Sequence, residues 1–104
     1  MKKTILVVED EKLSRKLIVG TLINHGFECL TAENGQYALD ILENNHCDLI
    51  LTDLRMPIMD GIELIKKLKE DNRTSNIPII MCTGAMLTSE HLQIALEAGA
   101  VDYI

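Results

Sequence analysis

The sequence predicts a single α/β domain built on a parallel β-sheet, and three observations support this. Short continuous apolar runs alternate along the chain with segments whose apolar residues recur at helical spacing. The apolar runs do not alternate with polar residues, which is typical of strands buried on both faces. The chain has 104 residues, 47% of them hydrophobic and 25% charged, which is enough for one small domain with a core.

Five segments are candidate strands, and helices separate them, as in a series of βαβ units. The three stronger candidates are rich in β-branched residues: Ile5–Val8, Leu49–Leu51 and Ile79–Met81. Two weaker candidates are Phe27–Ala32 and Val101–Ile104. Pro78 suits the first residue of the fourth strand, where no ladder hydrogen bond needs its missing N–H.

Four segments carry apolar residues three and four positions apart, so each set shares one helix face. The sets are Leu13, Leu17, Ile18, Thr21 and Leu22; Ala38, Ile41 and Leu42; Ile62, Ile65 and Leu68; and Leu92, Ala95 and Leu96. We expect the first helix to end at His25–Gly26 and the fourth at Gly99. Asp60 and Glu63 resemble a capping box at the start of the third helix.

Composition excludes several classes of function. The net charge is −6, which argues against a nucleic-acid surface on this domain, because phosphate binding needs a basic patch. No apolar run approaches the roughly 18 residues that cross a bilayer, and the start of the chain lacks a signal-peptide core. Three cysteines without CxxC spacing argue against a disulfide framework or a zinc site. We therefore expect a soluble, cytoplasmic protein without a membrane partner.

Polar residues follow three of the strands at the points where the strands end. Glu9 and Asp10 follow the first strand, Asp53 follows the third, and Thr83–Gly84 follow the end of the fourth. If the first and third strands are neighbours, the three carboxylates converge at one edge of the sheet, and at least one pKa should rise. A hard divalent cation such as Mg²⁺ would relieve their repulsion and leave positions for phosphate oxygens.

These residue types suit phosphoryl transfer. An ionised aspartate is a competent nucleophile toward phosphorus and gives an acyl phosphate. The transfer mainly requires positioning and neutralisation of the phosphoryl oxygens. Besides a cation, the hydroxyl of Thr83 and nearby N–H groups can contribute, and Gly84 leaves space for the phosphoryl group.

Four blocks of sequence, in the same order, resemble the receiver domain of two-component response regulators. The blocks are Ile5–Glu11, Asp53–Gly61, Pro78–Gly84 and Ala98–Ile104. The resemblance covers the whole chain. It implies a flavodoxin-like, doubly wound parallel sheet with strand order 2-1-3-4-5.

The resemblance also implies a role for each site residue. Asp53 would accept a phosphoryl group from a histidine kinase or a histidine phosphotransfer protein. Asp10 would bind Mg²⁺ directly, together with Asp53, and Glu9 would bind it through water. The backbone carbonyl of Arg55 would be a further ligand.

Two further residues would respond to the phosphoryl group. Thr83, beside Gly84, would turn inward to bond a phosphoryl oxygen, and Tyr103 would be the aromatic that swings inward with it. The resulting change of conformation would control a downstream effector. The domain would not be an enzyme beyond assisting its own phosphorylation and dephosphorylation.

The sequence departs from the receiver pattern at one end. Receivers carry a lysine just beyond the fifth strand and then a last helix, and both would fall after Ile104. We therefore expect residues 1–104 to be a receiver domain that is incomplete at its C-terminus. Without the last helix, exposed apolar surface would favour a homodimer or a domain swap.

Three alternatives remain open. A Mg²⁺-dependent phosphatase or phosphotransferase with an aspartyl intermediate would need an Asp-x-Asp motif after the first strand, where Glu9-Asp10-Glu11 stands. An FMN-binding protein of the same fold would need a phosphate loop rich in Ser, Thr and Gly there. A receiver-like interaction module that takes no phosphoryl group would keep the fold but show no phosphorylation of Asp53.

Overall fold

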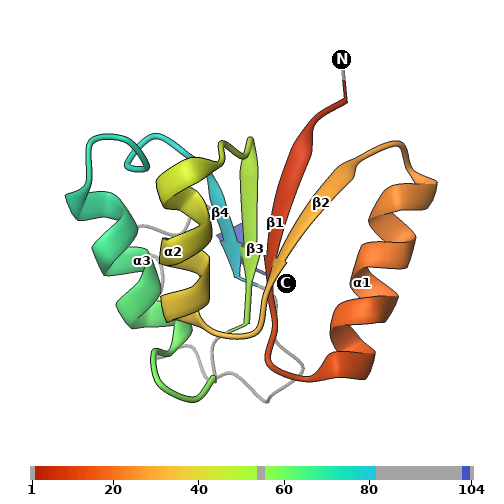
Figure 1. The fold of residues 1–104 in the computed structure, drawn as a ribbon, viewed down its shortest axis with the longest axis horizontal. Coiled ribbons are helices and arrows are strands. Elements are labelled where there is room, and N and C mark those ends of the chain that lie inside the picture. Colours follow the sequence, from red (N-terminus) through yellow and green to blue (C-terminus); the bar gives the residue numbers. More distant parts are fainter. Residues whose placement is uncertain (1, 54–55, 82–101, 104) are drawn as a thin grey trace.

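The fold was examined in a computed structural model, which describes residues 2–53, 56–81 and 102–103. Strands and helices alternate along most of this part of the chain (Figure 1). The elements are β1 (Thr4–Val8), α1 (Lys12–Asn24), β2 (Glu28–Ala32), α2 (Gly35–Asn44), β3 (Leu49–Thr52), α3 (Gly61–Glu70), β4 (Ile79–Met81) and β5 (Asp102–Tyr103). The five predicted strands are confirmed, with small shifts of their ends. The helix predicted around Leu92–Leu96 lies outside the described residues.

The strands form one parallel sheet in the order β2-β1-β3-β4-β5, which confirms the predicted doubly wound topology. Helix α1 lies on one face of the sheet, and α2 and α3 lie together on the other (Figure 1). The central strand β1 pairs with both β2 and β3, so Val8 is in register with Ala32 on one side and Thr52 on the other. This register aligns the ends of the three strands at one edge of the sheet.

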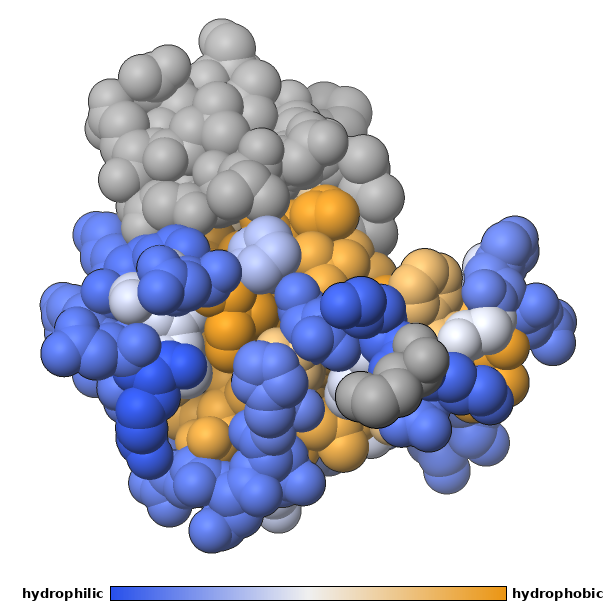
Figure 2. Space-filling model, turned by 90° about the horizontal axis from the view of Figure 1, so that it is seen from above, coloured by the Kyte–Doolittle hydropathy of each residue, from blue (hydrophilic) through white to orange (hydrophobic). Residues whose placement is uncertain are grey.

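The core lies mainly between the sheet and the layer formed by α2 and α3. Buried side chains from β1, β3 and β4 meet buried side chains of the two helices, among them Leu6, Ile50, Ile79, Leu64 and Leu68, all 0% exposed. The continuous apolar runs of these strands are explained by this burial. Seen from above the view of Figure 1, a hydrophobic band lies between hydrophilic surfaces on two sides (Figure 2).

Local hydrogen bonds define where the helices begin and end. Asp60 accepts a hydrogen bond from the Glu63 backbone N–H at 2.8 Å, so the predicted cap of α3 is confirmed. Helix α2 has an equivalent cap, which no sequence motif indicated: the buried Asn34 side chain accepts from the Tyr37 N–H at 2.9 Å. The chain leaves α1 through Gly26, whose φ is +91°, as expected for a glycine after a helix.

Candidate functional site

The sheet register brings the acidic residues to one edge. Val8 and Thr52 are paired, so Glu9 and Asp53 follow paired positions on neighbouring strands. The Glu9 N–H donates to the Ala32 carbonyl at 3.0 Å, and the Asp53 N–H donates to the Val8 carbonyl at 3.0 Å. The ladder therefore continues one residue beyond each strand and holds both backbones in place.

The three carboxyl groups predicted to form a cation site lie together. Glu9, Asp10 and Asp53 each offer a carboxylate oxygen, and these oxygens all lie within 4.8 Å of one another. Mg²⁺ binds oxygen at about 2.1 Å, so two ligands of one ion stand at most about 4.2 Å apart. The cluster therefore needs only a small closure, or one bridging water, to hold a single hard cation. We call these three residues the acidic cluster.

Burial and, to a lesser degree, repulsion raise the pKa of Glu9 in the acidic cluster. Burial is the largest cause that raises the pKa of Glu9, to about 7, and a hydrogen bond with Asp10 and the charges of Asp53 and Asp10 add to it. The backbone N–H of Glu11, 3.3 Å from a Glu9 carboxylate oxygen, acts in the opposite direction. The expectation that crowded carboxylates would raise at least one pKa is met at Glu9. A bound cation would favour the ionised form and reverse this effect.

Two neighbours of the acidic cluster were not singled out by the sequence. The Arg15 guanidinium on α1 donates from Nη1 to the Glu9 carbonyl oxygen at 2.8 Å and so ties α1 to the end of β1. Thr52 is fully buried, and its hydroxyl donates to the Asp53 carbonyl at 3.0 Å. Both bonds join groups close in sequence, but no motif marks either residue.

The remaining predicted site residues are described only in part. Arg55, Thr83 and Gly84 lie outside the described residues. Tyr103 lies in β5 and is in register with Met81 of β4, so its backbone runs beside the end of β4. Their predicted roles therefore stay predictions.

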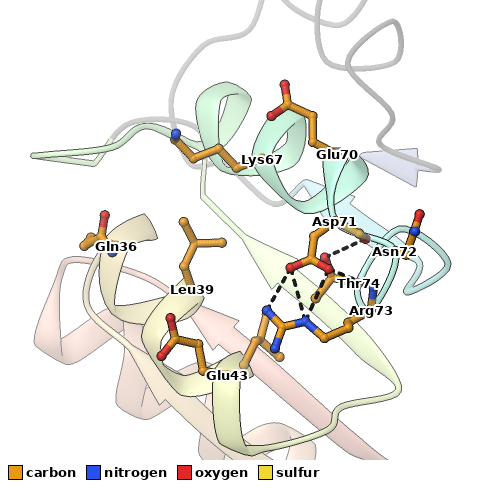
Figure 3. A pocket seen from close by; sticks show the side chains of 10 residues that line it. Gln36, Leu39, Glu43, Lys67, Glu70, Asp71, Asn72, Arg73 and Thr74 are labelled. Carbon is orange, nitrogen blue, oxygen red and sulfur yellow. Dashed lines mark hydrogen bonds and ion pairs between the residues drawn. The ribbon is translucent and has the colours of Figure 1, made fainter.

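A separate hollow lies between α2 and α3, away from the acidic cluster (Figure 3). Its volume is about 640 Å³, and its lining includes Gln36, Glu43, Lys67 and Arg73. Arg73 forms an ion pair with Asp71, which stands two residues earlier in the chain; Arg73 Nη2 lies 2.9 Å from Asp71 Oδ2. The lining mixes both signs of charge and does not include any member of the acidic cluster.

The described part of the chain contains no helix that is both long and apolar enough to span a membrane.

Comparison with known proteins gives a consistent result. The response regulator receiver domain family matches residues 5–104. The phosphate regulon transcriptional regulatory protein PhoB of Pseudomonas aeruginosa is 46% identical over 102 residues, which are 98% of this chain and 44% of that protein. The chain therefore spans less than half the length of that regulator.

Solved structures agree in fold. The chemotaxis protein CheY4 of Vibrio cholerae matches with a TM-score of 0.93 and 29% identity, covering 100% of this chain and 86% of that one. The receiver domain of the sensor histidine kinase PA1611 of Pseudomonas aeruginosa matches with a TM-score of 0.89 and 28% identity, over 100% and 84% of the chains. That structure is described as having a magnesium ion coordinated in the active site cleft.

Proposed function

The chain belongs to the response regulator receiver domain family, and from this premise we propose that Asp53 accepts a phosphoryl group from a phosphohistidine. The donor would be a histidine kinase or a histidine phosphotransfer protein. The observation that carries the proposal is the convergence of Glu9, Asp10 and Asp53, whose oxygens lie within 4.8 Å of one another at the carboxyl edge of the sheet. Ligands of α/β sheets bind at this edge.

The transfer follows from the chemistry of the groups. A carboxylate oxygen of Asp53 attacks the phosphorus, and the new O–P bond forms as the P–N bond of the donor breaks. The electron pair of the broken bond and a proton remain with the donor imidazole. Asp53 is suited to this because its N–H is bonded to the Val8 carbonyl, which holds its backbone at the end of β3.

Asp10 and Asp53 would bind Mg²⁺ directly, and Glu9 would bind it through water. The cation would neutralise charge on the phosphoryl oxygens and on the cluster itself. The three side chains of the acidic cluster all offer carboxylate oxygens, which suit a hard cation rather than a softer metal. Thr83, Gly84, Tyr103 and the carbonyl of Arg55 keep the roles that the family pattern implies.

The consequence of phosphorylation would be a change of conformation that controls an effector, with the domain acting in the cytoplasm. The domain would catalyse no reaction on a separate substrate and would assist only its own phosphorylation and dephosphorylation. Its net charge of −6 supports partners other than nucleic acid.

The test is an intact-mass measurement after incubation with acetyl phosphate and Mg²⁺. We expect one phosphoryl adduct in the unchanged protein, none in Asp53→Asn, and none with EDTA. Asp40→Asn is the matched control, because Asp40 is an exposed aspartate on α2 whose carboxylate bonds Gln36 at 3.1 Å, away from the cluster. This variant should keep the adduct.

Two results would contradict the proposal. An adduct that persists in Asp53→Asn would place the phosphoryl group elsewhere. A folded protein that takes no adduct from acetyl phosphate or from a phosphorylated histidine donor would favour a receiver-like interaction module instead.

A further inference from the structure

One peptide group joins two members of the acidic cluster, Glu9 and Asp10, and it is held from both sides. The Glu9 N–H donates to the Ala32 carbonyl at 3.0 Å, next to the end of β2. The Glu9 carbonyl accepts from a side chain: Arg15 Nη1 donates to it at 2.8 Å. This carbonyl and the Asp10 N–H belong to the same planar group, so the bond from Arg15 fixes the direction in which the backbone enters Asp10.

The connection that carries Asp10 has little other support from the described residues. Helix α1, which follows it, has no buried residue, and Glu11 gives that helix no side-chain cap. Asp10 itself is exposed. The Glu11 N–H reaches a Glu9 carboxylate oxygen at 3.3 Å, which is a long bond and uses a group of the acidic cluster itself. The bond from Arg15 is therefore the main support of this connection from α1.

Arg15 is well placed for this role because both its backbone and its side chain are held. Its N–H donates to the Glu11 carbonyl at 2.9 Å in the first turn of α1. Its side chain is half-buried and lines a hollow of about 280 Å³ together with Thr31, Ala32 and Tyr37. The guanidinium thus reaches from α1 past the end of β2 to the Glu9 carbonyl.

The charge of Arg15 by itself predicts the opposite effect on a cation. A guanidinium near the acidic cluster repels Mg²⁺, so its removal would strengthen Mg²⁺ binding if charge were its only influence. Loss of a bond that positions Asp10 would weaken Mg²⁺ binding instead. The two roles therefore differ in the sign of the change that a neutral substitution produces.

We propose that Arg15 positions Asp10 through its hydrogen bond to the Glu9 carbonyl and thereby raises the affinity of the acidic cluster for Mg²⁺. This rests on the proposed function, because it takes the acidic cluster to be a cation site. Arg15 touches neither the cation nor the phosphoryl group in this scheme and is a positioning residue. A purely structural role predicts a loss of stability with unchanged Mg²⁺ affinity in the folded protein.

The test follows the backbone N–H signals by NMR as Mg²⁺ is added, which gives the dissociation constant. Arg15→Met removes the donor and keeps a good helix former. We expect it to bind Mg²⁺ about tenfold more weakly, the low end of what loss of a group supporting metal ligands costs. Unaltered or tighter binding by Arg15→Met would overturn the proposal.

Lys16→Met is the matched control for the lost charge. Lys16 is the next residue of α1, is exposed, and makes no hydrogen bond or ion pair with any described residue. The variant carries the same change of charge as Arg15→Met and should bind Mg²⁺ at least as tightly as the unchanged protein. Weakening as large as that in Arg15→Met would overturn the proposal.

A second comparison separates positioning from general support of the fold. Without Mg²⁺, Arg15→Met should shift the Asp10 N–H signal, because that N–H shares a peptide group with the carbonyl that loses its bond. Leu22→Ala loosens α1 at its other end, where Leu22 is half-buried, and leaves Arg15 in place. It should lower the melting temperature without changing Mg²⁺ affinity. Equal weakening in both variants, or an unmoved Asp10 signal, would overturn the proposal.

Thermal melts first establish that each variant is folded at the temperature of the titration. If Arg15→Met does not fold, Arg15→Gln carries the same test, because its amide nitrogen ends at the level of Nε, short of Nη1. Protein that binds Mg²⁺ but takes no phosphoryl group on Asp53 would contradict the proposed function, while the comparison of Arg15→Met with Lys16→Met still decides the inference. Protein that binds no Mg²⁺ would overturn both.

Discussion

Helices α1 and α3 have similar apolar spacing in the sequence but differ in how far the fold buries them. Helix α3 contributes Leu64, Ile65 and Leu68 to the core, each 0% exposed. Helix α1, on the opposite face of the sheet, has no buried residue, and its Leu13 and Leu17 are each 64% exposed. Helical spacing thus indicates which side of a helix is apolar, whereas burial depends on what the rest of the fold places against that side.

The two helices also differ in local support. Asp60 caps α3, Glu63 lies in its first turn, and Lys67 and Lys69 lie in its last turn, all favourable for the helix dipole. Helix α1 begins at Lys12, the preceding Glu11 gives it no side-chain cap, and it has neither an acid in its first turn nor a base in its last. Helix α3 is therefore stabilised both by packing in the core and by its cap and terminal charges, whereas α1 has little of either.

Leucine truncation should give the largest difference between the helices. Leu68→Ala is expected to lower the free energy of unfolding by about 2–5 kcal/mol, because it leaves a cavity in a closed core. Leu17→Ala should change it by no more than about 0.5 kcal/mol, because that side chain is mostly exposed. Urea denaturation of both variants measures the contrast. Equal losses would mean that α1 is covered in solution, as the predicted dimer or domain swap would require.

Cap removal should give a smaller difference in the same direction. Asp60→Ala is expected to cost about 1 kcal/mol, because the Glu63 N–H loses its acceptor. Glu11→Ala, at the equivalent position of α1, should stay within about 0.5 kcal/mol, since no side-chain cap is lost. Thermal melts at constant pH compare the two. A comparable loss in Glu11→Ala would show that α1 is capped after all.

The smallest effect is expected at Glu9, which lies in the connection that leads into α1. It concerns how the stability of the fold depends on pH. The pKa of Glu9 is raised to about 7 in the folded protein, so the folded state holds this proton more tightly than the unfolded state. The resulting stability is fully present below the ordinary glutamate pKa and is lost as pH rises through about 7. Glu9→Gln removes this dependence, so the variant should gain stability relative to the unchanged protein between about pH 5 and pH 8.

The midpoints of urea denaturation measure how Glu9→Gln changes stability. They are compared for the variant and the unchanged protein at about pH 5 and about pH 8, without divalent cation. The gain should be modest, because the carboxyl is only partly buried and water screens its repulsion. Asp40→Asn provides the control for loss of one exposed acid elsewhere. The interpretation fails if Glu9→Gln and Asp40→Asn show the same dependence on pH.

Much of the candidate site was accessible to sequence reasoning because its residues lie at strand ends. Glu9, Asp10 and Asp53 come within two residues of an apolar run, and a parallel sheet brings such positions to one edge. Arg15 and Thr52 were missed, because a hydrogen bond to a backbone carbonyl leaves no motif. The close packing of Met59 against Gly35 in the core was not predicted either, because it depends on the space that a missing side chain leaves.

The sequence by itself determined the order of strands and helices, the acidic residues at the strand ends and the cap at Asp60. These features depend on local spacing and local hydrogen bonds, which a short window of residues contains. Only the tertiary structure decided that α3 is buried while α1 is exposed, that Met59 lies against Gly35, and that burial raises the pKa of Glu9. Each of these depends on which surfaces meet in the folded protein. That is decided by segments far apart in the sequence, which no short window of residues contains.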